Sequence, residues 1–263
     1  EKILREEMQE IGEEKREGRL NGINMNGRDP RRLIEELIMR IKEGDIAPET
    51  AWNAIKSAKE YYIRNIRSFT NVRDAEQSWH SYIGNKFQEL IYEILKRYVE
   101  QLKKDDEKYR TLCVLNAGEV KRNEILFRKV AVRYGDFLLL PDLDICIADC
   151  TGDWDSKILC VVSCKTSLRE RIAQACYWKL KFLASDVTKH IKMYLVTTDN
   201  DEDFFLNRKR REEYNGKSRN RIISEYELDG IYILREDFSE EMESEKVKKY
   251  EKIFDDLKRI FAK

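Results

Sequence analysis

The stretch from Leu138 to Arg171 decides the fold of this chain, and it reads LLLPDLDICIADCTGDWDSKILCVVSCKTSLRER. Two short apolar runs, Leu143–Ala148 and Ile158–Cys164, stand on either side of residues 151–156. Because the intervening residues are rich in turn formers, the pattern predicts a β-hairpin.

The hairpin would bring opposite charges together. Side chains alternate between the two faces of a strand, so Ser163 and Lys165 share one face and Cys164 takes the other. Asp142 and Asp144 share a face at the start of the preceding strand. A lysine at the end of an apolar run is unusual unless its charge is paired. A carboxylate that can hold a divalent cation, beside a lysine that can stabilise a developing anion, suits phosphodiester hydrolysis.

These residues carry a family resemblance. Pro141-Asp142-Leu143-Asp144 followed by Ser163-Cys164-Lys165 resembles the PD-(D/E)XK nucleases. The continuation from Lys165 to Arg171 resembles type II restriction endonucleases, especially those that read CCGG-like sites. The resemblance covers roughly residues 76–198, and it implies an α/β core in which a mixed central sheet is flanked by helices.

The resemblance also implies catalytic roles. Asp144 would be the metal-binding carboxylate, and the carbonyl of Cys164 would complete a Mg²⁺ shell, because Mg²⁺ favours hard oxygen ligands. Lys165 would lie near the attacking water and the scissile phosphate. Hydrolysis would be an in-line attack by a metal-activated water.

One position departs from the family pattern. Ser163 stands where the pattern has Asp or Glu, and a hydroxyl is a poorer cation ligand than a carboxylate. Either another acid replaces it, with Glu89 and Glu170 as the candidates, or the metal binds weakly, or the site is inactive. Gln88, on the preceding helix, has two interpretations: it orients a water or contacts the metal through its carbonyl oxygen, or it is a polar edge residue.

The residues after Lys165 are expected to contact DNA. Arg169 and Arg171 can each present a fork to guanine, and Glu170 can accept a hydrogen bond from cytosine. Thr166 and Ser167 connect this reader to the catalytic lysine and are assigned to the DNA-binding set. The alternative for the charged residues is surface ion pairing at a helix N-terminus.

The first 74 residues are predicted to form a helical subdomain for DNA contact or dimerisation, and residues 75–263 to form the catalytic core. Helices are expected over Arg31–Lys42, from Pro48 onward, and over Gln77–Glu100. The loop before the first of these helices is a connector, or a DNA-contacting loop that uses Met25, Asn26 and Arg28.

Further elements follow from periodicity. Strands are expected over Ile125–Tyr134, His190–Thr198 and Asp229–Leu234. Helices are expected from Arg169 to about Ala184 and over Val247–Phe261. Strands that alternate with helices indicate a mixed α/β sheet covered on both faces.

Composition limits the remaining function classes. Fifty Lys and Arg balance fifty Asp and Glu, so any DNA surface depends on uneven charge distribution. The densest basic stretch includes Arg208–Arg211, Lys217, Arg219 and Arg221, and it is either a solvated loop or a phosphate-contacting one. The six cysteines have no CxxC pair, which favours free thiols in a cytoplasmic protein over zinc. No apolar run has transmembrane length, so no membrane partner is expected.

The sequence therefore predicts a Mg²⁺-dependent type II restriction endonuclease that cleaves double-stranded DNA at a short G/C-containing palindrome. A palindromic site mirrors two-fold symmetry, so a homodimer is expected. A repair or junction nuclease of the same fold is the first alternative. A catalytically inactive DNA-binding protein is the second, because Ser163 replaces the usual acid.

Overall fold

The computed structural model describes residues 19–20, 23–24, 30–57, 59, 72–152, 154–168, 171–206 and 214–262. The chain divides into two compact units, residues 1–83 and residues 84–263. Among the described helices, none combines the length and the apolar character that a membrane span requires.

The first unit contains the short strands β1 (Arg19–Leu20) and β2 (Ile23–Asn24), which pair antiparallel. It also contains α2 (Pro30–Glu43), α3 (Pro48–Ser57) and the beginning of α5 (Val72–Asp105). Apolar side chains at helical spacing form its core: Leu33, Ile34, Leu37, Ile38, Ile41, Trp52, Ile55, Trp79 and Ile83. Met25, Asn26 and Arg28 lie outside the described residues, so DNA contact by this loop stays a prediction.

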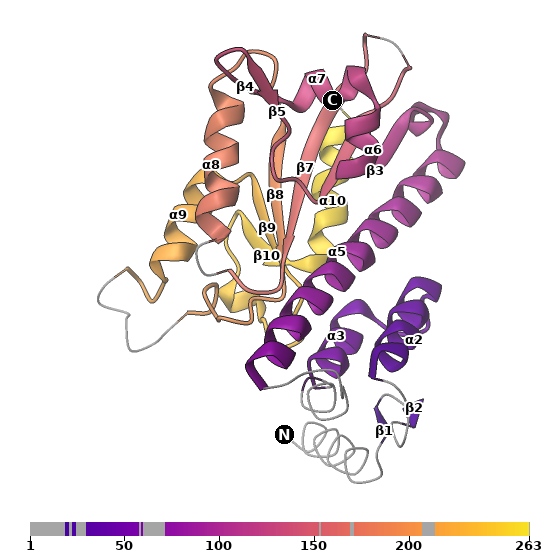
Figure 1. Ribbon diagram of the computed structural model, residues 1–263, viewed down its shortest axis with the longest axis vertical. Helices are drawn as coiled ribbons and strands as arrows, with labels where there is room; N and C mark the ends of the chain where they lie inside the picture. Colours follow the sequence, from indigo (N-terminus) through magenta and orange to yellow (C-terminus); the bar gives the residue numbers. More distant parts are fainter. Residues whose placement is uncertain are drawn as a thin grey trace. The chain divides into compact units, whose positions relative to one another are not determined.

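The second unit is built on a six-stranded mixed sheet of order β10-β9-β8-β7-β6-β3 (Figure 1). β7, β8, β9 and β10 run parallel to one another. β6 runs antiparallel to both of its neighbours, β7 and β3. The strands are β3 (Leu112–Asn116), β6 (Ile145–Asp149), β7 (Lys157–Lys165), β8 (Lys192–Thr197), β9 (Gly230–Ile233) and β10 (Val247–Lys249).

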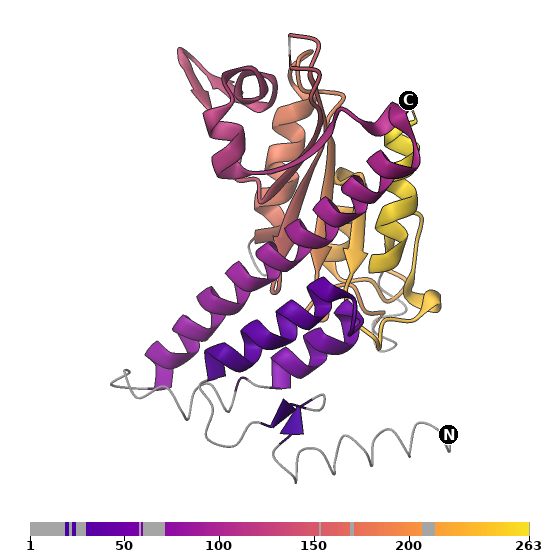
Figure 2. The ribbon, with the colours of Figure 1, turned by 90° about the vertical axis from the view of Figure 1, so that its right-hand side faces the viewer.

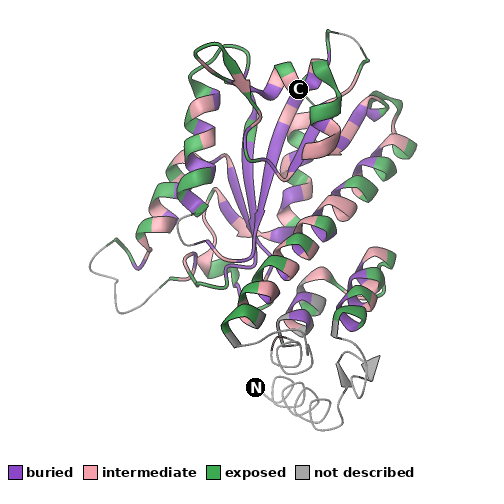
Figure 3. Cartoon of the chain, in the orientation of Figure 1, coloured by how far each residue is buried: buried purple, intermediate pink, exposed green. Residues whose placement is uncertain are grey.

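Helices cover both faces of this sheet. α8 (Arg171–Leu183) and α9 (Arg219–Glu227) lie on one face, while α10 (Ile253–Phe261) and α5 from Gly84 onward lie on the other (Figures 1 and 2). The four inner strands of the sheet, β6 to β9, are mostly buried, whereas the edge strands β3 and β10 are only partly buried (Figure 3). The mixed sheet flanked by helices is the fold class that the sequence predicts.

The predicted hairpin is present, and the last three residues of β7 extend beyond its pairing with β6. β6 pairs antiparallel with β7 from Ile145↔Val162 to Asp149↔Lys157. β7 continues for three residues beyond Val162 and pairs there with β8, as far as Lys165↔Thr197. The final residues of β7 therefore lie beside the chain that enters β6, which is where Asp144 stands.

One predicted strand is wrong. Residues 125–130 belong to α7 (Glu124–Val130), and only β4 (Val132–Tyr134) of the predicted strand is extended. The side chain of Asn123 caps α7 by accepting a hydrogen bond from the N–H of Leu126. α7 follows α6 (Ala117–Arg122), and β4 pairs with β5 (Phe137–Leu139). A short apolar segment fits either period, and here the cap favours the helix.

The predicted closing helix begins later than expected. Its first residues form β10, in which Val247 pairs with Ile231 of β9, and α10 starts only at Ile253. Short 3₁₀ helices in the described part of the chain are η1 (Glu107–Tyr109), η3 (Glu240–Met242) and η4 (Tyr250–Lys252). Strand pairing at a sheet edge is a tertiary contact, so helical periodicity alone did not reveal it.

The basic stretch near α9 is partly structural. Arg221 is 1 % exposed, and its guanidinium bonds to Glu225, to the carbonyl of Phe204 and to the carbonyl of Met242. Lys217 also pairs with Glu225. Phosphate contact by Arg221 is therefore excluded by its burial, while residues 208–211 lie outside the described part of the chain.

Candidate active site

Asp144 lies immediately before β6, and its carboxylate accepts four hydrogen bonds. Its Oδ2 accepts hydrogen bonds from the N–H of Cys164 at 2.6 Å, from Lys165 Nζ at 3.1 Å and from Ser163 Oγ at 3.4 Å. Its Oδ1 accepts from Gln88 Nε2 at 2.7 Å. Four of the residues that the sequence assigns to catalysis or metal binding thus meet on one carboxylate.

Lys165 is enclosed together with this carboxylate. The side chains of Lys165 and Asp144 are 8 % and 7 % exposed, and Asp142 Oδ2 is 3.9 Å from the same ammonium group. The side chain of Asp142 is 48 % exposed. Asp144 is therefore the principal partner of the lysine, and Asp142 approaches it from the solvent side.

The helix α5 supplies Gln88 to the site. Glu89, one residue further along the helix, is more exposed and pairs with Lys86 at 3.0 Å. Consecutive helical residues point in directions about 100° apart. Gln88 therefore faces Asp144, and Glu89 is held on the helix surface by Lys86. Glu170 lies outside the described residues.

Burial sets the electrostatics of the carboxylate. Loss of solvation raises the pKa of Asp144 above its usual range, while Lys165 and the Cys164 N–H act in the opposite direction. Burial also raises the pKa of the Cys164 thiol well above its ordinary value. The thiol is therefore an inert packing group, and the backbone is the part of Cys164 that takes part in the site.

The available oxygen atoms fit a hard divalent cation. In a strand the N–H and C=O of one residue point to the same side, so the Cys164 carbonyl is directed toward the Asp144 side of β7. Carboxylate and carbonyl oxygens are the ligands that Mg²⁺ prefers, and Mg²⁺ retains several waters. The described residues contain no cluster of three or more Asp, Glu, His or Cys able to hold a metal. Asp144 and the carbonyl of Cys164 are the oxygen-bearing groups that could hold such a cation here.

The segment after Lys165 is tied to the loop after β8. The carbonyl of Thr166 accepts hydrogen bonds from Thr198 Oγ1 at 3.1 Å and from the N–H of Asn200 at 3.2 Å. Arg171 is exposed and is the first residue of α8, and its N–H donates to the carbonyl of Leu168. Arg169 and Glu170 lie outside the described residues.

The loop after β8 was not identified from the sequence. Asp199 and Glu202 both adopt the left-handed conformation, with φ of 46° and 58°. Asp199 is fully buried, and its carboxylate accepts the N–H groups of Asp203 and Phe204 at 2.8 Å each. The run of Asp and Asn residues signals a turn, but nothing local indicates which segment the turn supports.

Asp199 gives this loop a pH-dependent stability. Burial raises the pKa of Asp199 to about 6. Between the ordinary Asp pKa and this value, the folded chain holds a proton that the unfolded chain has released, so stability falls as pH rises. The free energy of unfolding of wild type should therefore decline relative to that of Asp199→Asn between about pH 3 and pH 7, by about 3 kcal/mol. Urea titrations across this range measure the difference, and parallel curves would contradict it.

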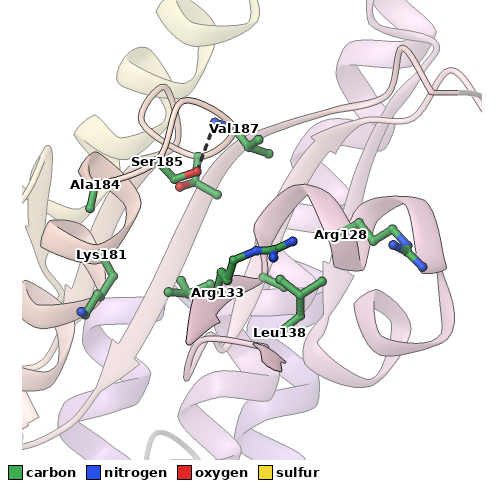
Figure 4. Close-up of a pocket in the computed structure, with 10 residues that line it drawn as sticks. Arg128, Arg133, Leu138, Lys181, Ala184, Ser185 and Val187 are labelled. Atoms are coloured by element: carbon green, nitrogen blue, oxygen red, sulfur yellow. Dashed lines mark hydrogen bonds between the residues drawn. The ribbon is translucent and has the colours of Figure 1, made fainter. Parts of the chain in front are cut away.

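A pocket of about 490 Å³ lies beside the far end of α8 (Figure 4). Arg128, Arg133 and Lys181 line it, but the three cationic groups do not converge in Figure 4. Arg128 pairs with Glu124 at 2.8 Å, and Lys181 lies over the ring of Tyr134. α8 begins next to the Lys165 segment and ends at this pocket, so the pocket is separate from the candidate active site.

Known proteins resemble this chain over most of its length. Residues 119–256 match the family model described as BsaWI restriction endonuclease type 2. A Methanocaldococcus jannaschii protein named "Putative type II restriction enzyme MjaVIP" is 39 % identical over 220 residues, which cover 80 % of this chain and 92 % of that protein. The Helicobacter pylori protein named "Probable type II restriction enzyme HpyAORF263P" is 35 % identical over 131 residues, 49 % of this chain and 64 % of that protein.

Among solved structures, the complex titled "Restriction endonuclease PspGI-substrate DNA complex" aligns with a TM-score of 0.47. The two chains are 13 % identical, and the alignment covers 90 % of this chain and 94 % of the other.

Proposed function

The chain belongs to the BsaWI family of type II restriction endonucleases, and from this premise we propose that it cleaves double-stranded DNA with Mg²⁺ at a short palindrome containing G·C pairs. The observation that carries the proposal is the contact between Lys165 Nζ and Asp144 Oδ2 at 3.1 Å, at the open end of β7.

In this proposal Asp144 and the carbonyl of Cys164 would hold Mg²⁺, and Gln88 would either contact the ion through its amide oxygen or orient a water. When bound, Mg²⁺ lowers the pKa of a coordinated water and neutralises phosphate charge. Lys165 binds the scissile phosphate and stabilises the negative charge that develops during in-line attack. Ser163, whose hydroxyl reaches Asp144 at 3.4 Å, helps to orient that carboxylate.

Digestion of plasmid DNA tests the proposed function. Purified protein incubated with Mg²⁺ should give discrete fragments whose sequenced ends share one short palindrome. Ends scattered over many sequences would favour a repair or junction nuclease. DNA that is bound but uncut at every Mg²⁺ concentration would favour an inactive DNA-binding protein and would contradict the proposed activity.

Gln88 should control the affinity for Mg²⁺. Gln88→Glu places a second carboxylate beside Asp144, so half-maximal cleavage should need less Mg²⁺ than in wild type, by roughly tenfold. Gln88→Ala removes the amide and should raise the Mg²⁺ requirement. The measurement is the initial cleavage rate as a function of Mg²⁺ concentration. Glu100→Gln, at an exposed carboxylate further along the same helix, is the matched control, and equal curves for all variants would contradict this role.

Arg169 and Arg171 should determine base preference. If each guanidinium contacts one guanine, Arg171→Ala should cost about 1–3 kcal/mol of discrimination at one base pair while cleavage elsewhere in the site keeps its preference. The same holds for Arg169→Ala at its own base pair. Competitive cleavage of substrates with every single-base replacement measures this. A uniform loss over all substrates would instead indicate a phosphate contact.

We also propose that the active protein is a homodimer, because a palindromic site presents two equivalent half-sites. The helical subdomain predicted for residues 1–74 is proposed to contribute to DNA contact or dimerisation. Sedimentation with and without a cognate duplex measures the assembly, and a monomer in both states would contradict the dimer.

A further inference from the structure

Asp201 anchors the segment that leads from the candidate active site into α8. Its Oδ2 accepts hydrogen bonds from Ser167 Oγ at 2.5 Å and from the N–H of Leu168 at 2.8 Å. Both bonds end on the same carboxylate oxygen. The backbone of Thr166 is bound to the same loop, so three consecutive residues after Lys165 are fixed by residues 198–201.

The supporting loop has a constrained geometry. Asp199 and Glu202, on either side of Asp201, both have positive φ, which non-glycine residues adopt only where the surroundings hold them. Arg235 Nη1 also donates to the carbonyl of Asp199 at 2.9 Å. Constrained backbone of this kind is common next to functional sites, where it places other groups accurately.

The charge of Asp201 is unexpected for a surface near DNA. An exposed carboxylate repels phosphate groups, so its presence weakens general binding to nucleic acid. The two hydrogen bonds to Ser167 and Leu168 offer a reason for it. The first of these bonds uses the hydroxyl proton of Ser167, so donation from that hydroxyl to a phosphate would require the hydrogen bond to Asp201 to break.

We propose that Asp201 is a positioning residue for DNA recognition. By fixing Ser167 and Leu168, it sets the direction in which the chain leaves Lys165, ahead of α8, which begins at Arg171. This role rests on the proposed function, because the segment that Asp201 holds is the one assigned to DNA contact.

Two substitutions separate hydrogen bonding from charge. In Asp201→Asn the amide oxygen can accept both hydrogen bonds while the charge is lost, whereas Asp201→Ala loses both bonds and the charge. Asp201→Ala should raise KM and reduce the ratio of cleavage at the cognate site to cleavage at single-mismatch sites, each by roughly tenfold, with a smaller change in kcat. Asp201→Asn should stay close to wild type in both quantities.

A second readout does not depend on activity. Exchange of the Leu168 amide hydrogen should be faster in Asp201→Ala than in wild type, and Asp201→Asn should restore protection. Asp186→Ala is the matched control, because Asp186 is an exposed carboxylate paired with Lys189 beyond the end of α8. It should alter neither the exchange of Leu168 nor the mismatch ratio.

The outcomes are distinguishable. If wild type is active and Asp201→Ala has the same KM, mismatch ratio and Leu168 exchange rate as wild type, the positioning role is wrong. The proposed function is then unaffected. Tighter DNA binding by both variants with an unchanged mismatch ratio also overturns it, because charge would then be the only contribution. A wild type that cuts no DNA overturns the proposed function and with it the use of this segment in recognition, whatever the exchange of Leu168 shows.

Discussion

Replacement of Lys165 by methionine is expected to lower the rate of DNA cleavage by roughly a hundredfold to a thousandfold. Methionine keeps most of the buried aliphatic volume but has no charge to place on the phosphate. Because Lys165 is 8 % exposed, its charge acts in a partly desolvated site, where an electrostatic interaction is stronger than in water. Single-turnover cleavage of a cognate duplex at saturating Mg²⁺ measures the effect.

Lys192 provides a matched control for this experiment. It also follows a buried core position and pairs with an aspartate, Asp229, at 2.9 Å, but it lies at the start of β8 and its side chain is 45 % exposed. Lys192→Met should leave the cleavage rate near that of wild type. Wild-type activity in Lys165→Met, with DNA binding unchanged, would remove the assigned role of this lysine.

Asp144→Asn is expected to reduce cleavage by roughly a thousandfold or more and to weaken the binding of divalent cations. The substitution is nearly isosteric. The amide oxygen of asparagine can accept the hydrogen bonds of Cys164 and Lys165, and the Gln88 amide can rotate to accept from the new NH₂ group. The folded structure should therefore persist, which thermal unfolding checks, while calorimetry with Ca²⁺ reports cation binding.

Two comparisons make the assignment of Asp144 specific. Asp142→Asn, at the more exposed carboxylate 3.9 Å from Lys165, should retain much more activity. Asp144→Ala should lose activity and also stability, by about 3 kcal/mol or more, because it leaves the buried Lys165 ammonium without its main partner. An inactive Asp142→Asn beside an active Asp144→Asn would reverse the assignment of the metal-binding carboxylate.

Much of the secondary structure of the core could be predicted from the sequence, because it depends on local patterns. The long helix α5 was predicted as Gln77–Glu100 and extends over Val72–Asp105, since its apolar stripe persists for many turns. The hairpin β6–β7 followed from two apolar runs separated by turn residues. The strand alternation also placed Ser163 and Lys165 on one face.

Other elements could not be predicted, because their sequence patterns are ambiguous or because they depend on pairing with distant segments. The segment Glu124–Val130 is apolar and short, so its periodicity fits a strand as well as the helix that Asn123 caps. The edge strand Val247–Lys249 exists because it pairs with β9. Leu112–Asn116, which the sequence did not reveal as a strand, forms β3 by pairing with β6.

The sequence by itself determined the residue types and the strand alternation that give a phosphate-cleaving site its aspartate and its lysine. Only the tertiary structure decided which neighbours those groups have. Gln88 rather than Glu89 reaches Asp144, and Asp201 holds the segment beyond Lys165. The physical reason is that periodicity fixes the direction of a side chain relative to its own element, whereas packing of a helix or loop against a distant strand fixes what that side chain meets.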